Sequence, residues 1–420
     1  MSISNKLTAI NDAKLAIKTA IENKGVTVGA APLADFASKI NAIQSGGGTT
    51  SPLAWVRPPD WLEVPMPDAS EEIVYALFAV HPNGRRVSFN ITGSCHIDWG
   101  DGTSNSYASG ATILKVFDFN ALPEASWCSR GYRQALVVIT AASATGLTSL
   151  NLSLRHGAYA SSPPRSTLLD IAASLPKLTT SATHSLSLST ASSTQSNSGM
   201  LERVRLVVQK AGTFSVPLNG ITGYGPNLKR VEITTSSGFN GTDLFSGTRG
   251  LVNPDDIQIN WLGSGSGTAS GMFQNCSGLR ALPPIDASKI TSMGSFAAGC
   301  ESLETVDLPG TVNCTTVGAA FQNCGNLRSI VLNCTALTSA PGSQFIQNSI
   351  SIQRLVLTGL RYGLTVSFTA LERPALVEMF QSLGTANGAQ TITISSTPGA
   401  SSLTAEERAI ATEKGFTLSG

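Results

Sequence analysis

The chain has 420 residues and only 13% of them are charged, against roughly 25% in ordinary globular domains. Lysine plus arginine total 28 and aspartate plus glutamate total 27, so the formal net charge is +1 and no basic block stands out. This balance argues against a nucleic-acid partner. The longest apolar stretches fall short of the roughly 18 residues that a membrane helix needs, so we expect no membrane insertion.

The first 45 residues carry a heptad pattern, in which apolar residues recur at seven-residue spacing in two series. The predicted seam consists of Ile3, Leu7, Ile10, Ile17 and Ile21. Pro32 opens a second amphipathic stretch, so residues 1–45 predict a helical hairpin. Because three heptads are marginal alone in water, we expect this segment to anchor the chain by packing against copies of itself or a partner protein. A helical cap on the next domain is the alternative.

Residues 46–54 are rich in glycine and threonine and predict a flexible linker. Short β-branched runs separated by Gly, Pro and Asn then predict a β-sandwich over residues 55–145.

Within this sandwich, the sequence DWGDGT begins at Asp98. His96, Asp98 and Asp101 could face one cation, because alternate strand positions point to the same side. The favoured interpretation is a glycine turn whose backbone the two carboxylates bond, so no metal is expected.

From Leu147 onward the unit L-x-x-L-x-L recurs, which predicts a leucine-rich-repeat solenoid over residues 146–374. Clear copies are LTSLNL, LERVRL, LKRVEI, LETVDL, LRSIVL and IQRLVL. Weaker copies begin at Leu175, near Pro254 and at Leu279, the last distorted by Pro283 and Pro284.

Three cysteines of an F-x-x-C-x-x-L theme, Cys276, Cys300 and Cys324, lie 24 residues apart and predict a stacked column of thiols in the solenoid interior. The cysteine count is odd, at seven, and no CxxC pair occurs. We therefore expect reduced, mostly buried thiols rather than disulfides or a zinc site.

Residues 375–420 predict a C-terminal helical cap, since solenoid ends expose apolar surface that a terminal helix usually covers. A strand-like TITIS begins at Thr391, and the last helix starts near Thr404, which has capping-box spacing to Glu407. The fold class is thus mainly β: helical hairpin, β-sandwich, solenoid and helical cap.

The third and fifth positions of each repeat strand should point outward and line one continuous sheet face. The candidate binding residues on this face are Lys177, Arg203, Arg205, Arg230, Glu232, Asp256, Gln258, Asp307 and Arg354. The lysine and the first three arginines predict a basic stretch whose donor forks suit an anionic host cell-surface glycan or a protein. The alternative is a solvated face that is polar only for solubility.

The sequence offers little material for catalysis, so we expect no enzyme and no cofactor. It holds four histidines without tight spacing, no G-x-S-x-G elbow and no phosphate-binding loop. A glycan hydrolase needs two carboxylates about 5 to 10 Å apart, whereas Asp255 and Asp256 are adjacent and would point to opposite faces of a strand.

Several of these runs resemble known families. LETVDLPGTVNCTTVGAAFQNC, from Leu303, and MFQNCSGLRALPPIDASKITSM, from Met272, resemble the leucine-rich repeats of bacterial surface proteins, and DWGDGT resembles the WGDG turn of PKD-like β-sandwiches. AKLAIKTAIENKGVTVGAAPLADFASKINAI, from Ala13, is similar to a module that opens many bacteriophage virion proteins, including tail-fibre and adhesin-like chains. LTAEERAIATEKGF likewise resembles the end of phage-encoded repeat proteins.

The resemblance implies a phage virion protein that is assembled in the host cytoplasm and anchored to other virion proteins by its N-terminal segment. The heptad seam predicts that the chain forms a homo-oligomer. The absence of an apolar secretory signal fits that route. The expected role is a tail fibre or receptor-binding protein for host adhesion. A collar, whisker or capsid decoration protein is the alternative, followed by a bacterial surface adhesin and a glycan hydrolase.

Overall fold

The computed structural model of the chain divides into two compact units, Met1–Leu53 and Ala54–Gly420. The structure describes residues 54–83, 86–143, 146–147, 149–151, 167–177, 185–187, 200–208, 227–235, 241–262 and 265–420. The predicted helical hairpin of residues 1–45 and its seam from Ile3 to Ile21 lie outside the described residues.

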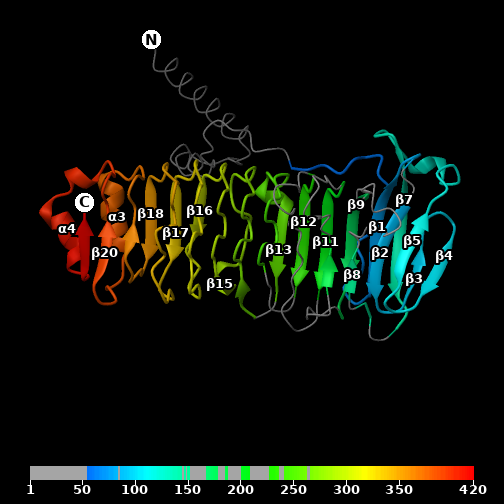
Figure 1. Cartoon of the computed structure of the whole chain (residues 1–420), viewed down its shortest axis with the longest axis horizontal. Coiled ribbons are helices and arrows are strands. Elements are labelled where there is room, and N and C mark those ends of the chain that lie inside the picture. The colour runs from blue at the N-terminus through cyan, green and yellow to red at the C-terminus, as the bar shows by residue number, and fades with distance from the viewer. Residues whose placement is uncertain are drawn as a thin grey trace, which may run out of the picture. The chain divides into compact units, whose positions relative to one another are not determined.

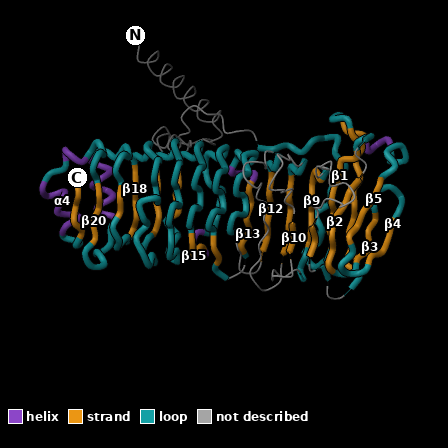
Figure 2. Tube along the Cα trace, in the orientation of Figure 1, coloured by secondary structure: helices purple, strands orange, loops and turns teal. Residues whose placement is uncertain are grey.

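The prediction of a mainly β fold is confirmed for the second unit, where strands far outnumber the two α-helices that the described residues form. Those helices, α3 (Arg373–Ser382) and α4 (Ala405–Thr412), lie together near the C-terminus (Figure 2). Neither helix is long and apolar enough to cross a membrane.

The predicted β-sandwich region forms two facing sheets. Its strands are β1 (Ile73–Val80), β2 (Arg86–Thr92), β3 (Cys95–Asp98), β4 (Ser104–Tyr107), β5 (Thr112–Val116), β6 (Trp127–Cys128) and β7 (Tyr132–Ala141), with a 3-10 turn at Glu124–Ser126. Trp99 is fully buried between the sheets, and its ring centroid lies 5.8 Å from that of Phe89 and 6.3 Å from that of Phe117. Large aromatic rings thus fill the space that the alternating strands enclose.

Both sandwich sheets continue into the repeat region. In the first sheet β9 (Leu168–Ser174) pairs antiparallel with β1, and β11 (Arg203–Val208), β12 (Arg230–Thr235) and β13 (Ile257–Trp261) then add parallel strands, giving the order β13-β12-β11-β9-β1-β7-β3-β4. In the second sheet β8 (Ser149–Asn151) joins β2, and β10 (Ser185–Ser187) joins β8. Figure 1 shows these strands side by side along one axis. The segments 55–145 and 146–374 therefore share continuous sheets.

Further along the chain, parallel strands stack at intervals of about one repeat. One ladder, which we name the outer ladder, follows the strands β11 to β13 along the chain and consists of β16 (Thr305–Leu308), β17 (Ser329–Asn333) and β18 (Arg354–Thr358). A second ladder is formed by the short strands β14 (Gly267–Thr268) and β15 (Ile290–Ser292). Between β13 and β16 the outer ladder holds only an isolated bridge from Ala281 to Thr305. Pro283 and Pro284 follow this bridge, and proline has no N–H to donate to a ladder.

The interior of the stack is built from columns of equivalent residues. The rings of Phe245, Phe273, Phe296, Phe321 and Phe345 are fully buried, with neighbouring centroids 5.4 to 6.3 Å apart. The predicted thiol column is confirmed: each of its three thiols is buried and donates to a carbonyl of the preceding coil, at 3.0 Å, 2.9 Å and 3.1 Å. Burial raises the pKa of Cys276 and of Cys324 to about 12, so these thiols stay protonated.

At the C-terminal end, helices take the place of outer strands while the second ladder continues as β19 (Leu364–Thr365), β20 (Gln390–Thr393) and β21 (Phe416–Ser419). The predicted capping box of α4 is confirmed, because the side chains of Thr404 and Glu407 each bond the other residue's backbone N–H. Lys414 Nζ donates to three carbonyls at the end of α3, at 2.7 to 2.9 Å. These bonds fasten the end of α3 to the residues that follow α4.

Candidate functional site

The expected alternation of inward and outward side chains holds on β11. Val204, Leu206 and Val208 are buried in the main core, and Arg203 and Arg205 lie on the opposite face of the sheet. That outer face was expected to be open. It is instead covered by residues 54–64, which we name the strap.

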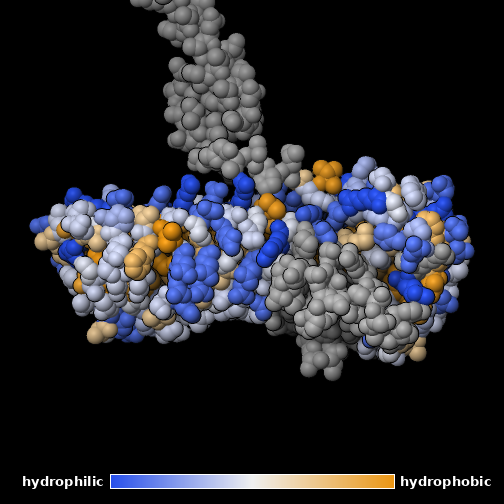
Figure 3. All heavy atoms as spheres, turned by 45° about the horizontal axis from the view of Figure 1, so that its top comes forward, coloured by the Kyte–Doolittle hydropathy of each residue, from blue (hydrophilic) through white to orange (hydrophobic). Residues whose placement is uncertain are grey.

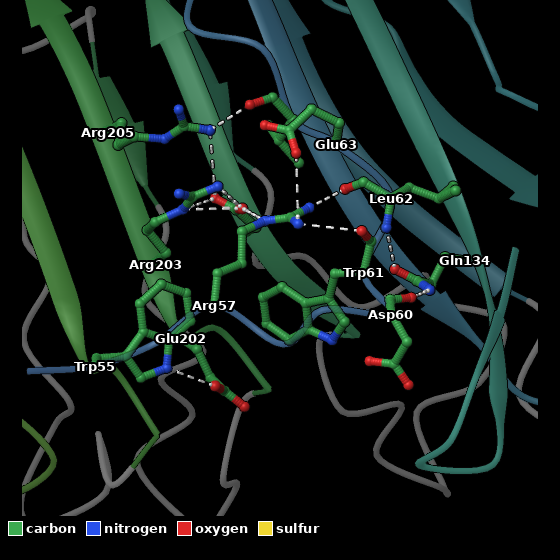
Figure 4. Close-up of polar contacts among 12 residues, drawn as sticks. Trp55, Arg57, Asp60, Trp61, Leu62, Glu63, Gln134, Glu202, Arg203 and Arg205 are labelled. Carbon is green, nitrogen blue, oxygen red and sulfur yellow. Dashed lines mark hydrogen bonds and ion pairs between the residues drawn. The ribbon is translucent and has the colours of Figure 1, made fainter.

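The strap contacts side chains from both halves of the nine-stranded sheet (Figure 4). The backbone N–H of Trp55 donates to Asp256 Oδ2 at 2.8 Å, and its indole N–H donates to Glu202 Oε2 at 3.1 Å. Leu62 N donates to Gln134 Oε1 on β7 at 2.9 Å. The strap thus bridges the parallel repeat strands and the antiparallel sandwich strands.

A second hydrophobic cluster, separate from the main core, lies beneath the strap. Trp61 and Val64 of the strap are buried there, and Trp61 Nε1 donates to the hydroxyl of Tyr132 at 3.1 Å. Leu169 and Ala172 of β9 complete the contact from the sheet. Burial of these side chains favours the closed position of the strap.

The polar centre of the site is Asp170, whose side chain is fully buried. Arg203 Nε donates to both carboxylate oxygens at 3.0 Å, and Arg57 Nε lies 3.8 Å from Oδ2. Arg205 Nη2 lies 4.0 Å from Oδ1 and donates to Val64 O at 2.7 Å. Burial, together with the charge of Arg203, lowers the pKa of Arg205. One carboxylate therefore holds three guanidinium groups.

Carboxylates pair with all three arginines of the predicted basic stretch. Five arginines take part in ion pairs of 4.0 Å or less in and around the strap: Arg57, Arg130, Arg203, Arg205 and Arg230. Five carboxylates oppose them: Glu63, Asp170, Glu202, Glu232 and Asp256. Arg205 is only 9% exposed. This network fastens the strap rather than presenting free donors to an anionic ligand.

The remaining candidate binding residues fall into two groups. Lys177 lies in the turn after β9 rather than on a strand. The strand of that repeat is Leu168–Ser174, which ends before the repeat copy predicted to begin at Leu175. Gln258, Asp307 and Arg354 are exposed on outer strands. Arg354 makes a two-pronged hydrogen bond with Glu378 of α3, at 2.7 to 3.1 Å.

The DWGDGT segment forms the glycine turn. Asp98 Oδ1 accepts from Gly100 N at 2.9 Å, and Asp101 Oδ1 accepts from Thr103 N at 3.0 Å. Lys115 Nζ lies 2.6 Å from Asp101 Oδ2. Burial acts to raise the pKa of Asp101, but the hydrogen bonds from Lys115 and Thr103 outweigh it and the pKa is lowered. Among the described residues, no group of three or more His, Cys, Asp or Glu could hold a metal ion.

Sequence reasoning did not identify the strap or Asp170. One local signal was present: Asp170 interrupts the apolar run LLDIAA, and a buried carboxylate requires partners. Those partners come from Arg57 and Arg203, which are far apart along the chain. Comparisons of the chain with family models, curated proteins and solved structures find no match.

Proposed function

We propose that the chain is a non-enzymatic bacteriophage virion protein, a tail fibre or receptor-binding protein whose parallel strands form a leucine-rich-repeat solenoid. Its N-terminal segment anchors it to other virion proteins, and the solenoid presents the surface that recognises the host. The observation that best supports this role is the strap. A chain that is anchored by its N-terminus and bound to a cell through its repeats carries load between the two, and the strap fastens the connecting residues to the sheet.

The recognition surface in this proposal is the outer face of the strands beyond the strap. Asp307 of β16 and Arg354 of β18 are exposed there. Val331 of β17 lies directly opposite Asp307, Val356 of β18 lies opposite Val331, and both valines are half-buried. On the face that Figure 3 shows, hydrophilic side chains predominate among the described residues, and apolar side chains form small separate patches. A face that mixes polar and apolar side chains is typical of non-obligate protein interfaces.

A structural role in the virion, as a collar, whisker or capsid decoration protein, is the second candidate. The pairing of Arg354 with Glu378 favours it, because that guanidinium already has a partner. A bacterial surface adhesin of the same repeat type is a third candidate.

Competition with infection tests the first proposal. The purified full chain, incubated with host bacteria before phage is added, should reduce phage adsorption in a dose-dependent way, and heat-denatured chain should not. Antibody raised against residues 271–420 should label the tail end of the particle. Label at the head or neck together with no competition would support the structural role, and label on uninfected cell envelopes would support the adhesin.

A further inference from the structure

The turn after β19 holds an exposed aromatic residue in an unfavourable backbone conformation. The side chain of Phe368 is 70% exposed, and its φ is +66°. Positive φ brings the Cβ of an L-residue close to its own backbone, so bulky residues avoid this region. Phe368 therefore carries both backbone strain and an exposed apolar ring.

The same turn recurs in other coils with small or short side chains at this position. In each of these turns, the N–H that follows the positive-φ residue bonds the carbonyl two residues before it, as in Thr369 N to Val366 O at 3.3 Å and Ala320 N to Val317 O at 3.1 Å. The residues equivalent to Phe368 are Asp243, Gly271, Ser295, Ala319 and Ser396, with φ between +51° and +63°. The turn itself therefore does not require an aromatic ring.

The polar neighbours of Phe368 are engaged within the protein. Ser367 Oγ lies 2.9 Å from Ser395 Oγ, and Thr369 Oγ1 donates to Val366 O at 2.7 Å. A sugar-binding aromatic platform works together with hydrogen-bonding groups aimed at the sugar hydroxyls, whereas these two hydroxyls already have partners. An exposed ring in such surroundings fits an apolar pocket on another protein better than it fits a glycan.

We propose that Phe368 is an anchor residue that inserts into an apolar pocket of a protein on the host cell surface. Strained backbone positions cluster at ligand contacts, where function retains a residue that stability alone would replace. The inference rests on the proposed receptor-binding function, and it adds the contacting residue and the class of partner.

The test compares two glycine variants of the full chain in the adsorption competition. Phe368→Gly should raise the melting temperature, because glycine adopts positive φ without strain, and should weaken competition by at least about tenfold. Ser396→Gly, at the equivalent position of the next coil, should also raise the melting temperature and leave competition unchanged. Phe368→Tyr retains the aromatic ring and the strain, so its melting temperature and its competition should match those of the wild type.

The results for the wild type and for Phe368→Gly distinguish a failure of the anchor assignment from a failure of the proposed function. If the wild type competes and Phe368→Gly competes equally well, the anchor assignment is wrong while the proposed function stands. If Phe368→Gly lowers the melting temperature, the ring has a structural role and the assignment is also wrong.

Protease treatment of the cells should abolish binding of the wild type. Competition by purified surface polysaccharide, with no effect of protease, would overturn the protein partner. If the wild type does not compete at all, the proposed function fails and the anchor fails with it.

Discussion

The strap region and the coils of residues 241–350 are stabilised in different ways. In the coils, each buried ring contacts its equivalents in adjacent coils and each thiol donates to a carbonyl of the preceding coil, so the same contacts are repeated along the stack. Under the strap each contact occurs once, and its centre is the buried charge of Asp170. A repeating stack can thus be stabilised by short-range pattern alone, whereas a junction between two architectures depends on contacts that are specific to it.

The largest expected effect tests the repeated column. Phe296→Ala removes a fully buried ring that contacts Phe273 and Phe321, so we expect a loss of about 3 to 5 kcal/mol in the free energy of unfolding. Denaturant unfolding of the full chain measures it. Phe368→Ala is the matched control, since that ring is exposed, and it should change stability by less than about 1 kcal/mol. Equal losses in the two variants would contradict the importance of the column.

The second prediction tests the unique contact. Asp170→Asn leaves three arginines without their shared buried carboxylate, so we expect a loss of about 3 kcal/mol. Hydrogen exchange should show faster exchange of the strap amides, such as those of Trp55 and Leu62. Asp307→Asn, on the open outer face, should change neither quantity measurably. A stable Asp170→Asn variant with a protected strap would show that the apolar cluster alone holds the strap.

A smaller effect is expected at the C-terminal cap. Lys414→Met keeps most of the side-chain volume and removes the three hydrogen bonds to the carbonyls at the end of α3, so the variant should lose about 1 to 2 kcal/mol. Hydrogen exchange should increase in Arg373–Ser382 and stay unchanged at the strap. An effect spread evenly over the chain would mean that the cap and the strap unfold together.

The smallest effect concerns acid stability of the sandwich. The pKa of Asp101 is lowered in the folded chain from its ordinary value of 3.8, so its contribution is present above that value and is lost as pH falls through the lowered pKa. Asp101→Asn should therefore remove a small part of the acid destabilisation below about pH 4. Melting temperatures of both chains between pH 2.5 and 6 measure it. Parallel curves would show that the pair with Lys115 adds nothing to stability.

The sequence predicted the mainly β fold and the thiol column, because the physical causes of both are local and periodic. Leucines at L-x-x-L-x-L spacing mark the inward face of several outer strands, and cysteines 24 residues apart mark the thiol column. The prediction failed at Leu175, where LLDIAA, upstream, is the strand. The strand Leu168–Ser174 pairs with both β1 and β11, and Pro176 follows it in the turn.

The sequence by itself determined the thiol column and the capping box of the last helix, because neighbouring residues and fixed spacings encode both of them. Only the tertiary structure decided that the sandwich and the repeats share their sheets and that the strap covers Arg203 and Arg205. Trp55 meets Asp256 across 201 residues of chain. No local pattern specifies such a contact, since it depends on which sheet edges meet and on where the folded chain places a buried charge and its partners.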